Sequence, residues 1–355
     1  MVSEKIKHLA LQRIPWSAAI ILAAVGLLLL TFPFLFTRPF PQHLMIMIFL
    51  FAMLGQAWNI VGGYAGQVSL GHAVFFGMGA YTSTVLVSRW GVNPWLGMLV
   101  GAVVAVAASI IIGYPCFKLT GPYFVIATIA AGEIVQILFI NWEWVGGARG
   151  LFVPLLEESL PNFQFHSTKV PYYYIALAML VLSILVVRWI ERSRLGYYLR
   201  AIKEDIDAAR GLGIDATKYK LIAMAISALL TALGGTFYAQ YVLYIDPASV
   251  LPLSLSIQVC LIAILGGVAT LWGPLIGALI LIPMAEFTRV YLGGGGRALH
   301  LVVYGALVVL VAVFQPGGLM ALVKGLKLPR LAPIGGESKP SPSRIYESTD
   351  HETRG

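Results

Sequence analysis

Charged residues are scarce in this chain. Of its 355 residues, 11% are Asp, Glu, Lys or Arg and 59% are hydrophobic, whereas charged residues make up about 25% of an average soluble domain. A water-soluble core of this length could not bury so much apolar surface, and the mean hydropathy is +0.84. The composition therefore excludes a soluble globular protein and indicates an integral membrane protein.

Cysteine and histidine are also rare. The two cysteines, Cys116 and Cys260, offer neither a disulfide framework nor paired metal-ligand spacing, and both are interpreted as small apolar residues. Six histidines are scattered along the chain, which argues against a membrane enzyme because catalytic groups must converge. The sequence predicts no catalytic residue and no metal site.

A nucleotide-binding motif is absent too. The phosphate-binding pattern G-x-x-x-x-G-K-[ST] does not occur, so we expect no cofactor in this chain and ATP hydrolysis only on another. The net charge of +8 does not indicate a nucleic-acid partner, because the basic residues lie in loops between apolar runs, where membrane topology explains them.

About ten apolar runs are long enough to cross, or nearly cross, a bilayer, since a span takes about 20 residues. They cover roughly residues 17–36, 43–63, 67–88, 95–113, 121–141, 171–190, 220–241, 253–268, 272–291 and 299–315. The third is polar and glycine-rich, so a broken or re-entrant helix is an alternative there. Ten spans place most of the 24 Lys and Arg residues and both termini in the cytoplasm, as the positive-inside rule requires.

The sequence thus predicts an all-α, polytopic membrane protein. Residues 1–16 form a cytoplasmic N-terminus, 17–320 a transmembrane domain and 321–355 a cytoplasmic tail. The tail is expected to be largely disordered, since its Ser, Pro, Gly and charged residues cannot bury enough apolar area. Within the transmembrane domain, residues 191–219 form the longest cytoplasmic loop.

That loop predicts a short amphipathic helix on the membrane surface. Steps of three and four residues place one set on a single face: Leu199, Ile202, Ile206, Ala209 and Gly213. Two i,i+4 ion pairs are expected on the other side: Arg200 with Glu204, and Lys203 with Asp207. Gly211 and Gly213 stop or bend the helix. From the pattern alone, a solvated connector resting on lipid headgroups fits equally well.

Within this loop, residues 207–214 (DAARGLGI) resemble the "EAA"-type loop through which permease subunits of ABC importers bind their ATPases. Three further segments add to the likeness: LGQAWNIVGGYAGQVSLGHAVFFGMGAY (54–81), TGPYFVIATIA (120–130) and ILGGVATLWGPLIGA (264–278). From about residue 45 to 320, the chain resembles the permease subunits of branched-chain amino-acid ABC importers, the LivM type.

This resemblance implies a bacterial inner-membrane importer for leucine, isoleucine and valine. It implies three kinds of partner: a second permease subunit, two cytoplasmic ATP-binding subunits and a periplasmic solute-binding protein. Similar permeases also carry urea, short amides or aromatic acids, so the solute stays open. An autonomous carrier or channel is the alternative from another class, but it would need an ion-coupling cluster or a repeated pore signature, and neither is evident.

The resemblance also assigns the docking residues. By this resemblance, Ala208, Ala209 and Gly211 are expected to contact the ATPase, and Gly213 ends the motif. The motif's usual Glu is replaced by Asp207, and Asp207 and Glu204 are candidates for pairing with basic groups on an ATPase. Together these residues form the predicted coupling set.

A few polar residues lie within the apolar runs. Glu133 is near the middle of run 121–141, where a lone charge costs about 2.5–3.5 kcal/mol, and Gln136 follows one turn later. Gln67, Ser69 and His72 come from the glycine-rich run. We expect each to face either a hydrated solute pathway or a neighbouring helix, as a packing group.

Overall fold

The computed structural model describes residues 16–291, 302, 305–306 and 319–320. The predicted tail lies outside these residues, as do nearly all of the predicted N-terminal segment and most of the tenth apolar run. Two compact units are distinguished, 29–326 and a second one of residues 1–28 with 327–355. The described part of the second unit, residues 16–28, is helical.

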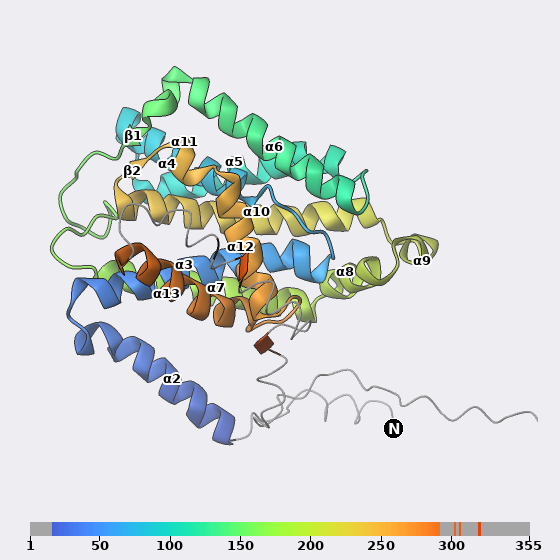
Figure 1. Cartoon of the computed structure of the whole chain (residues 1–355), viewed down its shortest axis with the longest axis horizontal. Coiled ribbons are helices and arrows are strands. Elements are labelled where there is room, and N and C mark those ends of the chain that lie inside the picture. The colour runs from blue at the N-terminus through green and yellow to red at the C-terminus, as the bar shows by residue number, and fades with distance from the viewer. Residues whose placement is uncertain (1–15, 292–301, 303–304, 307–318, 321–355) are drawn as a thin grey trace, which may run out of the picture. The chain divides into compact units, whose positions relative to one another are not determined.

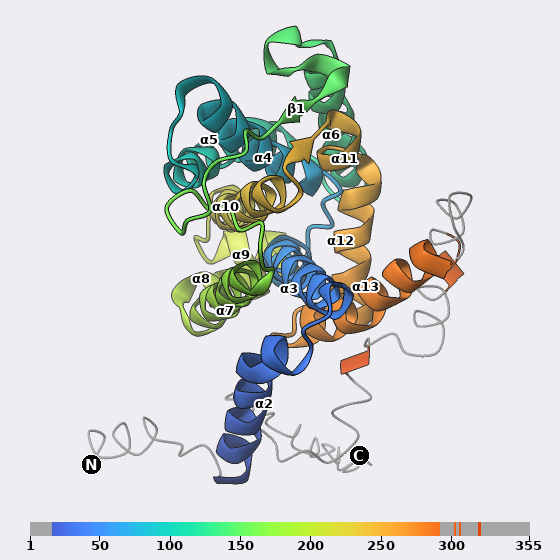
Figure 2. The ribbon, with the colours of Figure 1, turned by 90° about the vertical axis from the view of Figure 1, so that its left-hand side faces the viewer.

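The described part of the chain is mostly helical, as Figures 1 and 2 show. The long helices are α2 (Trp16–Leu35), α3 (Pro39–Asn59), α4 (His72–Trp90), α5 (Pro94–Cys116), α6 (Pro122–Asn141), α7 (Val170–Arg192), α10 (Ala216–Val242), α12 (Leu253–Gly266) and α13 (Gly273–Tyr291). The short helices are η1 (Ile60–Tyr64, a π-helix), η2 (Glu143–Val145), η3 (Gly147–Arg149), α8 (Arg194–Glu204), α9 (Ile206–Gly211) and α11 (Pro247–Val250). Two short strands, β1 (Leu151–Phe152) and β2 (Tyr244–Ile245), pair antiparallel. The all-α prediction is confirmed.

Local sequence signals set many helix boundaries. Proline occupies the first positions of α3, α5, α6 and α7, where its fixed φ suits a helix and its missing N–H is not needed. The side chain of Asn93 accepts a hydrogen bond from Trp95 N at the start of α5 (2.8 Å). Gly91 ends α4 in the left-handed region (φ 60°), the conformation that glycine adopts without a steric penalty.

Helices α4 and α10 pack backbone to backbone. A Cβ on Gly79 would lie 2.1 Å from the carbonyl oxygen of Ala232, and one on Gly235 would lie 2.0 Å from that of Phe76. The Thr236 hydroxyl donates a hydrogen bond to Gly79 O across the contact (3.0 Å). Only glycine permits this approach, so these two positions bring the two helices together.

The third apolar run begins with irregular backbone and is otherwise one unbroken helix, so the alternative of a broken helix is not confirmed. After η1 the chain is non-helical from residue 65 to 71, with Gly66 in the left-handed region (φ 69°), and α4 begins only at His72. Helix α12 runs steeply to its neighbours. Figures 1 and 2 show it crossing between the layer of α4 and α6 and the layer of α3 and α13.

The count of ten spans is not confirmed. Among the described residues, six stretches are long and apolar enough to cross a membrane: Pro39–Tyr64, Pro94–Cys116, Pro122–Asn141, Val170–Arg192, Ala216–Val242 and Pro247–Gly266. Shorter apolar stretches occur at Gly26–Leu35 and Gly273–Phe287. The polar and glycine-rich α4 is not among the six, because its residues lower the mean hydropathy.

Candidate functional site

The predicted cytoplasmic helix is in fact two helices. Asp205 has extended backbone (φ −153°, ψ 114°) and separates α8 from α9. Its carboxylate accepts hydrogen bonds from the backbone N–H groups of Asp207 (2.8 Å) and Ala208 (2.9 Å). The prediction of one continuous helix is therefore wrong, because Asp205 acts as the N-cap of a new helix, a position that aspartate favours.

The apolar side of this helix pair is largely as predicted. Leu199 and Ile202 on α8 and Ala209 on α9 are buried. Ile202 and Ala209 pack with Ala216 at the start of α10 in a small apolar cluster. Ala209 therefore holds α9 against α8 and α10, and its side chain is not exposed for contact with another protein.

The other side presents the rest of the coupling set to solvent: Glu204, Asp207, Ala208, Gly211 and Gly213 are all exposed. A Cβ on Gly211 would meet nothing within 4 Å, whereas Gly213 is in the left-handed region (φ 81°). Leu212 between them is 81% exposed. The sequence interpretation missed this apolar residue, although its position between two glycines could have indicated an exposed tip.

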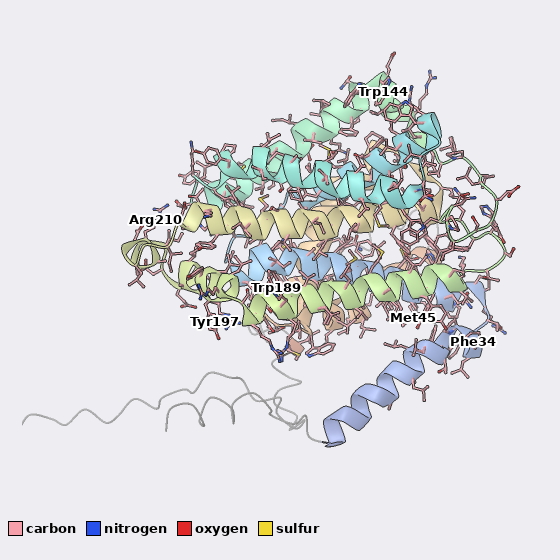
Figure 3. The ribbon with its side chains drawn as sticks, turned by 180° about the vertical axis from the view of Figure 1, so that it is seen from behind. Phe34, Met45, Trp144, Trp189, Tyr197 and Arg210 are labelled. Carbon is pink, nitrogen blue, oxygen red and sulfur yellow. The ribbon has the colours of Figure 1, made fainter. Side chains whose placement is uncertain are left out.

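Neither predicted i,i+4 ion pair is among the ion pairs of the described residues. Instead Asp207 pairs with Arg210 (3.5 Å), since the break at Asp205 changes the helical register. The Arg200 guanidinium lies over the ring of Tyr197 at 5.9 Å. Figure 3 shows Arg210 and Trp144 at opposite ends of the helix bundle.

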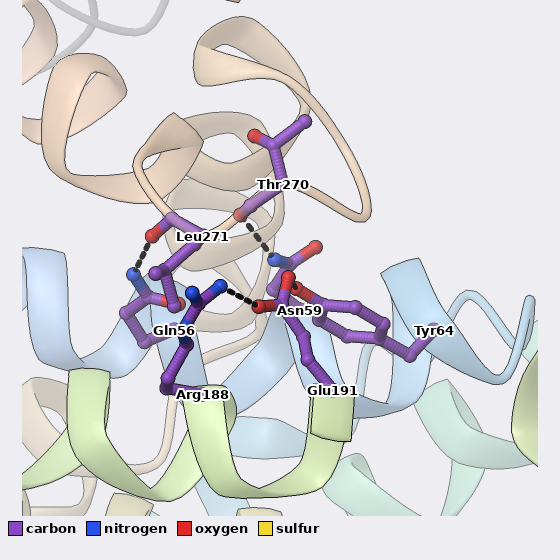
Figure 4. A network of polar contacts seen from close by, with 7 residues as sticks. All are labelled: Gln56, Asn59, Tyr64, Arg188, Glu191, Thr270 and Leu271. Carbon is purple, nitrogen blue, oxygen red and sulfur yellow. Dashed lines mark hydrogen bonds and ion pairs between the residues drawn. The ribbon is translucent and has the colours of Figure 1, made fainter. Parts of the chain in front are cut away.

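The helix pair is joined to the bundle near the broken segment. A Cβ on Gly66 would lie 2.8 Å from Lys203 Cγ, so α8 lies directly against the stretch that precedes α4. At the end of α7, Glu191 accepts a hydrogen bond from the Tyr64 hydroxyl (2.7 Å) and pairs with Arg188 (3.3 Å). The contacts of Glu191 are drawn in Figure 4. Together with the approach of Lys203 to Gly66, they connect α7 and α8 to η1 and the stretch that follows it.

A second polar clamp holds the loop between α12 and α13. Asn59 accepts a hydrogen bond from Ala269 N (2.8 Å) and donates one to Thr270 O (3.0 Å), and Gln56 donates one to Leu271 O (Figure 4). Both side chains come from α3 and are buried. The sequence interpretation missed them, although a buried amide within an apolar run is a signal that could have indicated them.

Ser69 and His72 lie inside the bundle, where His72 Nδ1 is buried with no hydrogen-bond partner among the described residues. His72 Nε2 lies 2.9 Å from Ser227 Oγ, and the Ser227 hydroxyl in turn donates to Ala57 O (2.6 Å). The backbone oxygen of Ser69 accepts a hydrogen bond from Trp58 Nε1 (2.7 Å). Both residues are buried. These contacts favour the packing alternative for the pair.

Hydroxyl groups on distant helices accept hydrogen bonds from backbone N–H groups at the start of α4. Ala73 N donates to Ser256 Oγ on α12 (2.8 Å), and Leu70 N donates to Thr128 Oγ1 on α6 (3.1 Å). Free N–H groups at a helix start would be costly in an apolar surrounding. Neither hydroxyl was singled out from the sequence, where a lone Ser or Thr in an apolar run is a weak signal.

The remaining pathway candidates lie elsewhere. Gln67 is partly exposed and its amide reaches only Gly66 O (3.4 Å). Gln136 donates to Pro247 O (3.4 Å), whereas Glu133 is exposed on α6. The five predicted pathway residues are therefore not brought together in one cavity.

Comparison with known proteins supplies what the geometry alone does not. The family model "Branched-chain amino acid transport system / permease component" matches residues 40–312. The high-affinity branched-chain amino acid transport system permease protein LivM of Salmonella typhimurium is 29% identical over 90% of this chain and 77% of its own length. LivM of Escherichia coli is 28% identical over 85% of this chain and 75% of its own length.

A second kind of permease also matches. The permease protein LivH of Salmonella typhimurium is 25% identical over 76% of this chain and 91% of its own length. No solved structure matches the chain significantly. With several apolar helices of membrane-spanning length and a family match over most of its residues, this multi-pass membrane protein belongs to the permease components of branched-chain amino acid transport systems.

Proposed function

We propose that this chain is the permease subunit of an ABC importer that carries leucine, isoleucine and valine across the bacterial inner membrane. A second permease subunit completes the membrane part, and two cytoplasmic ATP-binding subunits drive transport. A periplasmic binding protein delivers the solute. The family match over residues 40–312 carries this proposal.

The α8–α9 pair is the proposed ATPase contact. It exposes a charged and small-residue surface at one end of the bundle, with Leu212 at its tip. An ATPase that binds there reaches α7 and η1 through α8, Gly66 and the Tyr64–Glu191 hydrogen bond. Closure of the ATPases would then switch the bundle between inward-open and outward-open forms as a rigid-body movement.

Co-purification tests this function directly. A tagged chain, extracted in mild detergent from membranes that express the whole transport system, is expected to bring down a second permease and an ATP-binding subunit. Uptake of labelled leucine by vesicles containing this complex should require internal ATP. Recovery of the chain with neither partner would refute the proposal and favour an autonomous carrier.

The solute class is tested separately on the binding protein. We expect leucine, isoleucine or valine to raise its melting temperature, because a ligand that binds only the folded state stabilises it. Stabilisation by urea, a short amide or an aromatic acid instead would support the proposed importer but contradict the proposed solute.

A further inference from the structure

Among the six candidate membrane spans of the described residues, α6 is the least buried. Only Phe124, Thr128 and Phe139 on it are buried, and Figure 1 shows it at the edge of the bundle. Its outer face therefore contacts lipid, a hydrated solute pathway or another protein.

Six of the exposed side chains of α6 form a regular seam, and the exposed Ile134 and Leu138 lie beside it. The seam consists of Tyr123, Ile126, Ala130, Glu133, Ile137 and Ile140, which are all exposed. Their spacing alternates between three and four residues, which is the repeat by which two helices pack side by side. Space is open along the seam, since a Cβ on the neighbouring Gly132 would meet nothing within 4 Å.

Glu133 distinguishes this seam from a lipid-facing surface. It lies near the middle of α6, and none of the hydrogen bonds or ion pairs found for the described residues involves its carboxylate. The nearby Gln136 is directed to Pro247 O instead. An unpaired carboxylate facing lipid at this depth is strongly unfavourable.

Helix α5 provides the internal comparison. Its exposed face carries Leu96, Leu99, Val103 and Ile111, each more than half exposed and all apolar. This is the composition that a lipid-facing helix requires. The outer face of α6 has the same apolar character except for one charge at its centre, which is typical of a helix seam whose register is set by a polar group.

We propose that the outer face of α6 is the interface with the second permease subunit, where Glu133 accepts a hydrogen bond from a donor side chain of that subunit. This inference rests on the proposed function. The chain matches both LivM and LivH relatives, so a second permease of this family would present an equivalent helix. Two equivalent helices can pack about an approximate twofold axis.

Site-specific photo-crosslinking tests the contact. A benzoyl-phenylalanine is placed at Ile137 in the α6 seam or, as a matched control, at the exposed Val103 of α5. In membranes that hold the whole transporter, Ile137 is expected to cross-link to the second permease and Val103 only to lipid. Cross-linking of Ile137 only to lipid, or only to another copy of this chain, would overturn the interface.

Substitution of Glu133 tests the role of the charge. Glu133→Leu removes an acceptor that the proposed interface would bury, so recovery of the second permease should fall about tenfold or more. Glu133→Gln keeps an acceptor, so most of the second permease should still be recovered. Unchanged recovery with Glu133→Leu would overturn the role of the carboxylate. If no second permease is recovered even with the unaltered chain, the proposed function itself fails.

Discussion

Asn59 illustrates how a single side chain can hold a turn between two helices. It bonds the backbone N–H of Ala269 and the carbonyl of Thr270 with the two ends of its amide. Ala269 itself lies in the left-handed region (φ 58°), which is unfavourable for a residue with a Cβ. The amide therefore stabilises a strained turn between α12 and α13.

Replacing Asn59 by Leu should destabilise the protein by about 1–3 kcal/mol, because two backbone groups lose their buried partner. The melting temperature of the detergent-purified protein measures this effect. Ala107→Leu on the exposed face of α5 is the control and should leave it unchanged. An equal effect of both substitutions would contradict the role of Asn59.

Ala269→Gly should act in the opposite direction. Glycine adopts a positive φ without the steric cost that alanine pays, so the substitution is expected to stabilise the fold by up to about 1 kcal/mol. A rise in melting temperature is the measure. A fall in melting temperature would mean that the backbone at Ala269 is not strained, contrary to what its φ angle indicates.

At the scale of elements, the α4–α10 contact depends on two glycines. Gly79 and Gly235 let each helix approach the backbone of the other. Gly235→Val should therefore force the helices apart and lower stability by about 1–3 kcal/mol or more. Ala107→Val, on the exposed surface of α5, is the matched control in the same thermal assay, and its melting temperature should stay unchanged.

The α8–α9 pair yields a prediction about coupling. A Cβ on Gly211 would meet nothing within 4 Å, so a chain with Gly211→Trp should fold and insert normally. Binding of the ATP-binding subunit and solute uptake should each fall about tenfold or more, a loss of about 1.4 kcal/mol in docking. Glu157→Trp, on an exposed loop at the other end, is the control. Normal ATPase recovery with Gly211→Trp would remove α9 from the docking surface.

At the scale of the whole molecule, the opposite ends of the bundle should face opposite sides of the membrane. Leu212 and Leu155 are 81% and 75% exposed at these two ends, and both native cysteines are buried. In intact spheroplasts, a membrane-impermeant maleimide should label Leu155→Cys and spare Leu212→Cys, and inside-out vesicles should reverse the result. The same labelling pattern in both preparations would contradict the predicted orientation.

Local composition was enough to predict much of this molecule. Apolar runs depend only on neighbouring residues, so nine of the ten predicted runs coincide with helices between α2 and α13. The glycines and polar groups after Gly66 indicated irregular backbone in this run, but not that the irregular part would end before α4 begins. The docking loop was located by its motif, but the helical periodicity concealed the N-cap at Asp205.

What each polar residue contacts was decided by the tertiary structure alone. His72 meets Ser227, which is 155 positions away in the chain, and no local pattern specifies that encounter. For the same reason the sequence could not tell that Glu133 faces outward. That an apolar helix lies in a membrane can be predicted from its own residues, whereas the neighbours that cover each of its faces come from distant segments of the chain.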